Sequence, residues 1–471
     1  MADIEDDVEK GYEAPLREIA DQFGNIFYIK EELNRGGQGV VYRTTDKDVA
    51  IKQPIKQPGG ELDYSPELIG RYSKIRTLPL PKGIHLTTPL SILRDQPGYV
   101  MRLLGDMKAL SKVFRFGGQE KKSVENEAKP GWLSAVKDQD AAMQLMHYAK
   151  TGGARSRLEI LYLAAAQLAR LHLSGLVYGD VSDDNIFIGR NADGGFDRLE
   201  AWLIDVDNLR LERTTGGRWS YTDPFGAPEI VQRREPCRPR TDCWSFAVMA
   251  FKMLTLSHPF IGKKVMDDTE EEDDWASDPV QKDSSAMPLI KQANSGLLPY
   301  INDPEDDSNA YNGKGLHISL VSSKALQWLF LETFGPGRVQ PCRRPGMALW
   351  ALELAKAYDL SMTCPGCGMS YIAKENVKCP FCDKPRPAFF VAKMRDRGWE
   401  KVLFDGKELK HPLPHRIFHP FSLARCADVE YEAEIDTIKG IVRPSRGTKS
   451  FPMGLEFEFV AAVQEMKGAG S

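Results

Sequence analysis

Three side chains that suit phosphate and metal chemistry stand close together in the middle of the chain. Asp180 and Asn185 belong to Tyr-Gly-Asp-Val-Ser-Asp-Asp-Asn (178–185), and Asp205 ends the apolar segment Leu-Ile-Asp (203–205). An aspartate beside a substrate hydroxyl can orient it, whereas carboxylate and amide oxygens suit a hard cation such as Mg²⁺. The pattern therefore predicts a phosphoryl-transfer site with Asn185 and Asp205 as metal ligands.

A second set of candidates lies nearer the N-terminus. Asn-Arg-Gly-Gly-Gln-Gly-Val-Val-Tyr (34–42) stands between two strand-like segments, and Val-Ala-Ile-Lys ends at Lys52. Glycines such as Gly36 and Gly39 let the backbone approach phosphate oxygens, and a lysine at a strand end can contact the α and β phosphates. The glycine segment alone is equally typical of a structural hairpin, but together with Lys52 it indicates a nucleotide site.

The elements that must position these residues change along the chain. Short β-like segments occur at 25–33, 39–44, 49–52, 87–93 and 99–104. One helix is predicted at 66–76, with Ser65 as its N-cap before Pro66. From Leu158 onward the apolar spacing becomes helical. The sequence therefore predicts an α+β fold in which a small β-rich lobe of five strands and one helix precedes a larger helical lobe.

Taken together, the motifs at 25–358 resemble those of eukaryotic-type Ser/Thr protein kinases. The resemblance implies a bilobal protein-kinase-like fold that uses ATP with Mg²⁺ or Mn²⁺. In this family Lys52 matches the ATP-positioning lysine, Asp180 the catalytic-loop aspartate, and Asn185 and Asp205 the metal ligands. The helical partner of Lys52 is assigned to Glu67 in preference to Glu61, which precedes the predicted helix. The other ATP-binding residues implied are Gly36, Gly39, Val41, Ala50, the gatekeeper Met101, and Arg102 and Leu103 in the hinge at 102–104.

Two further motifs distinguish protein kinases from other ATP-dependent phosphotransferases. Thr-Asp-Pro-Phe-Gly-Ala-Pro-Glu (222–229) resembles the stretch that ends the activation segment and seats a peptide. Asp242 begins a segment that resembles the helix bracing the catalytic loop, and Arg344 matches the arginine that pairs with Glu229. The resemblance also implies that Thr222 hydrogen-bonds Asp180 and shares in catalysis. The expected acceptor is Ser or Thr in a protein.

The sequence departs from the family at several positions. Gly179 replaces an arginine that reads a phosphorylated activation loop, so activity is not expected to depend on that phosphorylation. Ser182 replaces a lysine that contacts the γ-phosphate, and Val206 replaces a phenylalanine after Asp205. Two alternatives remain open: an ATP-binding scaffold of pseudokinase type that recruits partners through its C-terminal segments, and a small-molecule kinase of the aminoglycoside or choline kinase type.

Four cysteines in two Cys-x-x-Cys pairs predict a metal site of a different kind. Cys364 and Cys367 form one pair, and Cys379 and Cys382 form the other. Four thiolates at this spacing are typical of a structural, tetrahedral Zn²⁺ site. The remaining cysteines are expected to be reduced thiols. We therefore predict a zinc ribbon at 361–388, followed by a small β-rich domain at 389–471 whose strands are suggested by alternation at 429–435 and 455–460.

Composition limits the classes of partner. The 471 residues are 42% hydrophobic and 27% charged, with a formal net charge of -4. These values are typical of a globular protein and give no sign of nucleic-acid binding. The acidic extension at 1–24 has no secretory signal, and no apolar segment is long enough for a membrane span, so a cytoplasmic location is expected. The acidic run at 267–274 is interpreted as a solvated loop.

The kinase-like region and the ribbon together resemble a narrower group. Bacterial Ser/Thr kinases with a C-terminal zinc ribbon accompany a metal-dependent protein phosphatase and a von Willebrand A protein in tellurium-resistance-type gene neighbourhoods. The segment Gly-Leu-Leu-Pro-Tyr-Ile-Asn-Asp (296–303) supports this resemblance. It implies a protein substrate, which could be the von Willebrand A protein, and an opposing phosphatase as partners.

Overall fold

The structure is a computed structural model that describes most of the chain between residues 16 and 463. The residues left out within that range are 38, 57–58, 192–197, 213–220, 267–286, 395–398, 405–409, 414–430, 445–449 and 452–453. The acidic run at 267–274 and Cys426 therefore lie outside the described residues. The chain divides into two compact units, one made of residues up to Leu78 together with Leu86–Met107, and the other of Pro79–His85 and everything from Lys108 onward.

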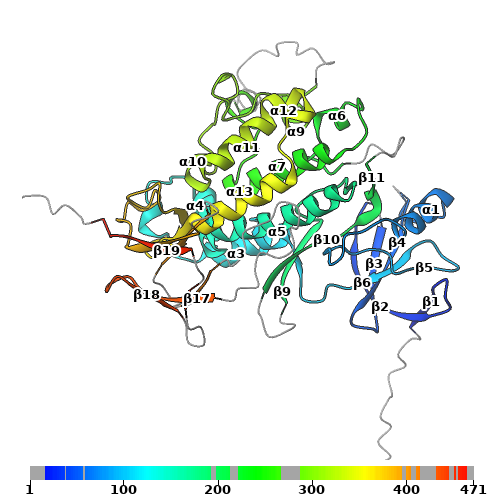
Figure 1. Ribbon diagram of the computed structural model, residues 1–471. Coiled ribbons are helices and arrows are strands. Elements are labelled where there is room, and N and C mark those ends of the chain that lie inside the picture. The colour runs from blue at the N-terminus through cyan, green and yellow to red at the C-terminus, as the bar shows by residue number, and fades with distance from the viewer. Residues whose placement is uncertain are drawn as a thin grey trace, which may run out of the picture. The chain divides into compact units, whose positions relative to one another are not determined.

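The N-terminal unit is built on one antiparallel sheet, drawn in blue in Figure 1. Its strands follow the order β1-β2-β3-β4-β6-β5, so each hairpin adds a neighbour and β4 lies inside the sheet. The bounds of the elements are β1 (Arg17–Ala20), β2 (Ile26–Arg35), β3 (Gly39–Thr44), β4 (Val49–Pro54), α1 (Pro66–Ile75), β5 (Ser91–Ile92) and β6 (Tyr99–Arg102).

The helix predicted at 66–76 is present as α1, and it packs through one face. Leu68, Tyr72 and Ile75 are buried at spacings of three and four residues, which places them on one side of the helix. The Tyr72 ring meets that of Tyr99 edge-on, with 4.7 Å between the ring centres. Pro66 at the first helical position fits because its missing N–H would have no intrahelical partner.

The prediction of five strands is wrong by one. β1 pairs with β2 from Arg17 to Ala20, inside the segment that the sequence assigned to an N-terminal extension. Ile19 is the only buried residue of this strand, so it gives no alternating pattern, yet it packs with Ile51, Leu93 and Val100. Of the segment predicted as a strand at 87–93, only residues 91–92 form a β-strand.

Helices dominate the second unit. Their bounds are α2 (Leu110–Phe114), α3 (Gly118–Glu125), η1 (Gly131–Leu133), α4 (Gln139–Lys150), α5 (Gly153–Leu173), η2 (Val206–Asn208), α6 (Pro228–Val231), α7 (Pro239–Thr255), α9 (Leu289–Asn294), α10 (Ile318–Val321), α11 (Lys324–Phe334), α12 (Pro336–Val339), η3 (Pro341–Arg343) and α13 (Met347–Leu360). Short strands lie between them: β7 (Lys108–Ala109), β8 (Leu176–Val177), β9 (Ile186–Asn191), β10 (Arg198–Leu203) and β11 (Arg210–Leu211).

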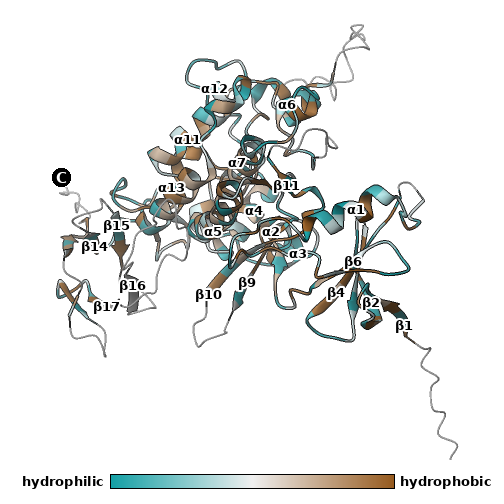
Figure 2. Cartoon of the chain, turned by 45° about the vertical axis from the view of Figure 1, so that its right-hand side comes forward, coloured by the Kyte–Doolittle hydropathy of each residue, from teal (hydrophilic) through white to brown (hydrophobic). Residues whose placement is uncertain are grey.

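The core of this unit surrounds α7, which is buried along almost its whole length. Helices α5, α11 and α13 contact one another or α7, and Figure 2 shows apolar colouring on them. Aromatic side chains fill the space between helices. Trp244 of α7 contacts Phe334 of α11 edge-on, and Phe330 contacts Trp350 of α13 in the same way. None of the described helices combines the length and the apolar character that crossing a membrane requires.

The C-terminal segments form small sheets that share a core. Strands β12 (Ser361–Thr363) and β13 (Ser370–Ile372) pair, and two three-stranded sheets have the orders β15-β14-β19 and β16-β17-β18. Their bounds are β14 (Phe389–Met394), β15 (Trp399–Leu403), β16 (Lys410–Leu413), β17 (Tyr431–Asp436), β18 (Ile441–Pro444) and β19 (Leu455–Val460). Cys364 and Cys379 pack in one buried cluster with Phe389, Val391 and Val402, so the cysteine-bearing segment and the following sheet have a common core.

Several hydrogen bonds attach the cysteine-bearing segment to the helical core. The Arg155 guanidinium of α5 donates to the carbonyl oxygens of Tyr358 and Ser361, each at 2.6 Å. The Ser370 hydroxyl donates to Gly152 O at 3.2 Å and accepts from the Arg155 N–H at 3.1 Å. A Cβ on Gly153 would lie 2.4 Å from the Ser370 hydroxyl, so the close approach requires a glycine. The helical core and the cysteine-bearing segment are therefore held together by partly buried polar contacts.

A buried ion pair that the sequence predicts joins α6 to the segment before α13. Both Glu229 carboxylate oxygens accept from the Arg344 guanidinium, at 2.7 and 2.8 Å, and both side chains are almost fully buried. Arg344 also donates to Gly337 O and Arg240 O, and its guanidinium lies 4.8 Å from the centre of the Trp244 ring. Four of the five N–H groups of the guanidinium thereby have an acceptor.

Replacing Arg344 with methionine should lower the free energy of unfolding by about 3–5 kcal/mol, because Glu229 would remain as a buried, unpaired charge. Arg343 provides a matched control: it pairs with Glu332 while 54% exposed, so Arg343→Met should cost about 1 kcal/mol or less. Urea-induced unfolding of the two variants measures the difference. An equal loss of unfolding free energy in the two variants would contradict the prediction that the buried pair stabilises the fold more than the exposed pair.

Candidate functional site

The β9–β10 hairpin brings the two candidate metal ligands to the same end of a sheet. Ile186, the first residue of β9, pairs with Leu203, the last residue of β10. Just beyond this pair, Ile204 N donates a hydrogen bond to Asn185 O at 3.0 Å. Asp205 follows Ile204 directly and has a left-handed backbone, with φ of 55°. Asn185 and Asp205 are therefore close neighbours at the end of the hairpin, where Asn185 precedes β9 and Asp205 follows β10.

The orientation of the Asn185 amide suits a cation ligand. Its Nδ2 donates to the carbonyl oxygen of Asp180 at 3.0 Å, which leaves the amide oxygen as the free end of the group. With the Asp205 carboxylate, this oxygen makes the hard-donor set that Mg²⁺ prefers. The residues present thus fit the ion that the motif implies.

Asp180 carries the hydrogen bond that the sequence predicts. The Thr222 hydroxyl donates to its Oδ1 at 2.7 Å, across 42 positions of sequence. Asp180 itself is buried, with 5% of its surface exposed. A short charge-assisted bond of this kind fixes the direction of a carboxylate. The stretch beginning at Thr222 is thereby joined to the loop that bears Asp180, Asn185 and their neighbours.

A single carboxylate on α7 holds the start of that loop. The two oxygens of Asp242 accept from the backbone N–H groups of Tyr178 and Gly179, each at 2.8 Å, and Asp242 is 1% exposed. The ring of His172, near the end of α5, meets Asp242 Oδ2 at 3.0 Å. Asp242 thus braces the loop as the sequence predicts. His172 was not singled out from the sequence; a histidine in the last turn of the helix before the loop was the available signal.

Tyr178 connects the loop to the neighbouring strand through its side chain. Its side chain is fully buried, and its hydroxyl donates to Ile204 O and lies 3.4 Å from Asn185 O. The Tyr178 hydroxyl therefore links the loop to the strand before Asp205. Val206 is also buried, with no exposed surface.

Gly179 has a backbone that favours glycine. Its φ is 83°, in the left-handed region, and a Cβ at this position would approach Asn208 to 3.2 Å. Any L side chain here would be strained by its backbone as well as crowded. The absence of an arginine at this position is therefore accompanied by local geometry that suits glycine.

Ser182 is buried, and its hydroxyl has no hydrogen-bond partner in the described part of the chain.

The candidate nucleotide residues of the N-terminal unit lie on three neighbouring strands. Val41 pairs with Lys52 across β3 and β4, and Ala50 pairs with Met101 across β4 and β6. Lys52 is 5% exposed. Gly36 N donates to Gly39 O at 2.9 Å, which joins the chain just after β2 to the first residue of β3. These residues share one sheet, and their roles toward ATP remain predictions.

Two details of this unit differ from the simplest expectation. A Cβ on Gly39 would lie 2.8 Å from Gln53 O, so β3 can approach β4 this closely only with a glycine at this position. This requirement is independent of any contact that Gly39 makes with phosphate. In the segment predicted to be the hinge, the N–H of Leu103 donates to Asp48 O at 2.8 Å. An adenine base would therefore have to pair with other backbone groups between Arg102 and Leu104.

Glu67 was predicted to be the helical partner of Lys52, and no contact in its described surroundings shows that pair. Glu67 lies in the first turn of α1 with its side chain exposed, and among the described residues it forms no ion pair or hydrogen bond. A carboxylate in the first turn stabilises a helix through the helix dipole, which accounts for glutamate at this place without a partner. The pairing of Glu67 with Lys52 stays a prediction.

The four predicted zinc ligands converge. Their Sγ atoms all lie within 4.8 Å of one another, and the Cys364–Cys382 and Cys367–Cys379 sulfur atoms are 3.6 Å apart. Disulfide-bonded sulfur atoms are about 2.05 Å apart, whereas a tetrahedron with Zn–S distances of about 2.3 Å has edges of about 3.8 Å. The spacing therefore fits a shared Zn²⁺ ion and does not fit disulfides. Gly366 N donates to Cys364 Sγ at 3.3 Å, as in a turn that folds around a metal.

The brace at Asp242 predicts a pH dependence of stability. Burial alone would lower the pKa of His172, but hydrogen bonds to Asp242 and Cys243, together with the Asp242 charge, raise it from 6.5 to about 9. A raised pKa in the folded state means that the stabilisation is complete below pH 6.5 and is lost as the pH rises through about 9. The thermal midpoint should fall over this window by more in the wild type than in His172→Gln. Parallel slopes for the two proteins would contradict this assignment.

Removing the metal should test the cysteine cluster directly. We expect about one zinc per chain by elemental analysis, and a strong chelator or Cys367→Ser should remove it. The thermal midpoint should fall, because a core that includes Cys364 and Cys379 would lose its central ligand bonds. Cys342→Ser, which changes an exposed thiol outside the cluster, is the control and should keep both metal and midpoint.

Comparison with known proteins points to kinases over part of the chain. A 131-residue stretch is 28% identical to leucine-rich repeat serine/threonine-protein kinase 1 of Caenorhabditis elegans, and a 109-residue stretch is 37% identical to ribosomal protein S6 kinase alpha-2 of Mus musculus. Ribosomal protein S6 kinase alpha-3 of Homo sapiens is 34% identical over 106 residues. These stretches cover 26%, 22% and 22% of this chain and 5%, 14% and 13% of the respective relatives. No protein-family model matches. Over about a quarter of its length, the chain is similar to Ser/Thr protein kinases.

Proposed function

We propose that this chain is a protein kinase that transfers the γ-phosphoryl group of ATP to Ser or Thr in a partner protein. One arrangement carries the proposal: Asp180 is held by Thr222, and Asn185 and Asp205 adjoin at the end of the β9–β10 hairpin. The similarity to Ser/Thr kinases supports the same reaction class.

In this reaction the acceptor oxygen bonds to the γ-phosphorus while the bond to the β–γ bridging oxygen breaks. Asp180 orients the acceptor hydroxyl and takes its proton, and Thr222 keeps the Asp180 carboxylate in one direction. Asn185 and Asp205 would hold Mg²⁺, which when bound neutralises charge on the phosphate oxygens. Lys52 would contact the α and β phosphates.

The scaffold alternative has specific observations in its favour. Glu67 forms no ion pair in the described residues, and Ser182 offers no positive charge near the transferred group. Both features would weaken stabilisation of the charged transition state. The alternative predicts nucleotide binding without transfer.

The finer assignments rest on sequence resemblance. We propose that the Cys₄ cluster holds structural zinc and that the chain acts in the bacterial group with a metal-dependent phosphatase and a von Willebrand A protein. The converging sulfur atoms support the zinc part of this proposal. The two partner proteins have the resemblance alone as their support.

The test is transfer of radiolabel from γ-labelled ATP with Mg²⁺ to degenerate Ser/Thr peptides and to the chain itself. Asp180→Asn should lower the rate by about 10²–10⁴-fold, because it removes the proton acceptor. Lys52→Ala should also lower it. Asp95→Asn, which changes an exposed carboxylate in the N-terminal unit, is the matched control and should leave the rate unchanged.

The outcomes separate the three readings. Equal labelling by wild type, Asp180→Asn and Lys52→Ala would overturn the proposed mechanism. ATP binding with no transfer to any acceptor would favour the scaffold. Transfer to aminoglycosides or choline, with none to peptides, would favour the small-molecule kinase.

A further inference from the structure

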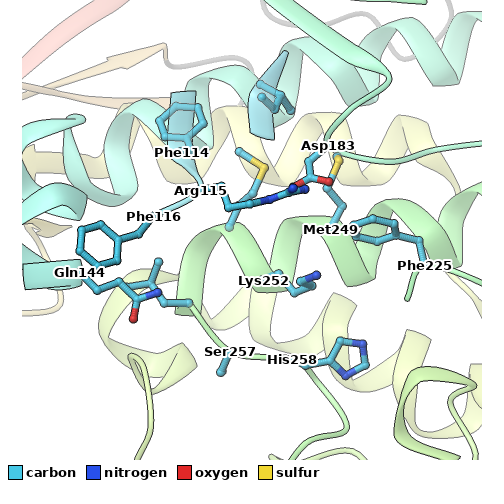
Figure 3. Close-up of a pocket in the computed structure, with 13 residues that line it drawn as sticks. Phe114, Arg115, Phe116, Gln144, Asp183, Phe225, Met249, Lys252, Ser257 and His258 are labelled. Carbon is cyan, nitrogen blue, oxygen red and sulfur yellow. The ribbon is translucent and has the colours of Figure 1, made fainter. Parts of the chain in front are cut away.

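A cavity of about 310 Å³ lies in the helical unit, outside the residues assigned above to phosphoryl transfer. Its walls come from α2, α4, α7 and the segment after α7, together with Asp183 and Phe225 (Figure 3). Most of the lining is apolar, including Phe114, Phe116 and Met249. The charged groups at its wall are Arg115, Lys252 and Asp183.

Two of these walls belong to the segments that hold the candidate acceptor site. Asp183 follows Asp180 by three positions, and Phe225 follows Thr222 by three. Phe225 N donates to Thr222 O at 2.8 Å, and the Ser245 hydroxyl of α7 donates to Phe225 O at 2.8 Å. On the other side, Ser111 N of α2 donates to Asp183 O at 2.9 Å. The cavity is therefore built onto the two segments joined by the Asp180–Thr222 hydrogen bond.

Carboxylates near the cavity are already engaged by a cation of the chain. The Arg115 guanidinium lies 3.1 Å from Asp183 and 3.6 Å from Asp184, and Figure 3 shows it extended toward Asp183. Burial works against its charge, but the two carboxylates raise the pKa of Arg115. A positively charged ligand would have to compete with Arg115 for these groups. His258 adds no charge, since burial lowers its pKa to about 3.

Lys252 is the cation that lacks such a partner. Its Nζ lies 4.8 Å from the centre of the Phe225 ring, and it forms no ion pair with any residue that the structure describes. Burial and repulsion by Arg115 lower the pKa of Lys252, and attraction by the nearby aspartates does not fully offset this. An ammonium group that is partly buried without an ion pair gains from an anion that enters beside it.

We propose that this cavity binds an anionic side chain of the acceptor protein, with Lys252 as the ion partner, and so selects acceptor sites that have a negative charge at one fixed flanking position. Glutamate, aspartate and phosphorylated serine share the required chemistry: a short apolar stem and an anionic end. Phe114 and Met249 contact the stem, and the ammonium meets the charge. The inference rests on the proposed function for the meaning of "acceptor", although binding to the cavity needs no transfer.

The test measures binding by fluorescence polarisation without ATP, so it does not depend on catalysis. Labelled peptides carry a central serine, and one flanking position at a time is Glu, phosphoserine, Arg or Gln. At one position the Glu or phosphoserine peptide should bind wild type about tenfold more tightly than the Gln peptide. The preference should shrink at high salt. The Glu and phosphoserine arms show whether a carboxylate or a phosphate is the natural anion.

Variants at Lys252 identify the cavity as the source of the preference. Lys252→Glu should reverse it in favour of Arg, and Lys252→Met, which keeps the apolar stem, should abolish it. Lys324→Glu makes the same charge change at the exposed start of α11 and should keep the wild-type preference. Retention of the acidic preference by Lys252→Glu or Lys252→Met would overturn the inference, as would equal binding of all peptides.

Labelling of the same peptides from ATP separates this inference from the proposed function. Peptides that bind with the acidic preference but receive no phosphate would sustain the inference and contradict the proposed reaction. Peptides that receive phosphate at rates independent of flanking charge would support the proposed reaction and contradict the inference about the cavity.

Discussion

The carboxylate of Asp242 is the constraint on which the candidate site depends. It is buried in α7, and its two oxygens accept from consecutive backbone N–H groups at Tyr178 and Gly179. A buried carboxylate is costly unless its oxygens are satisfied, so the loop and the helix stabilise each other. His172 supplies a third contact from α5. Because the loop start is fixed in this way, Asp180 and Asn185 follow at defined places, and Thr222 can reach Asp180.

The most predictable features of the molecule were the contacts between polar or charged residues at motif positions. The Thr222–Asp180 and Glu229–Arg344 contacts follow from motif positions, and each is present. Strand β1 was missed because a single buried residue, Ile19, gives no periodic signal. The surroundings of a carboxylate such as Glu67 could not be derived either, since a helix position fixes the face but not the distance to a particular strand residue.

The cysteine-bearing segment is integrated with its neighbours more closely than its spacing suggests. Spacing predicts four converging sulfur atoms, but it does not show that Phe389 and Val391 from the following strand complete the same core. Nor does it indicate that Arg155, far away in sequence, holds the segment to α5 and α13. Alternating apolar residues reveal that a face is buried without revealing what covers it. Structural information is needed for that second step.

Gly179 limits the substitutions that this loop can accept. An arginine introduced here, where the sequence resemblance to kinases would place one, would meet two obstacles at once, a left-handed backbone with φ of 83° and the crowding of Asn208. That single substitution would therefore destabilise the loop. An arginine at this position requires compensating changes in the loop first, so single substitutions have little freedom here.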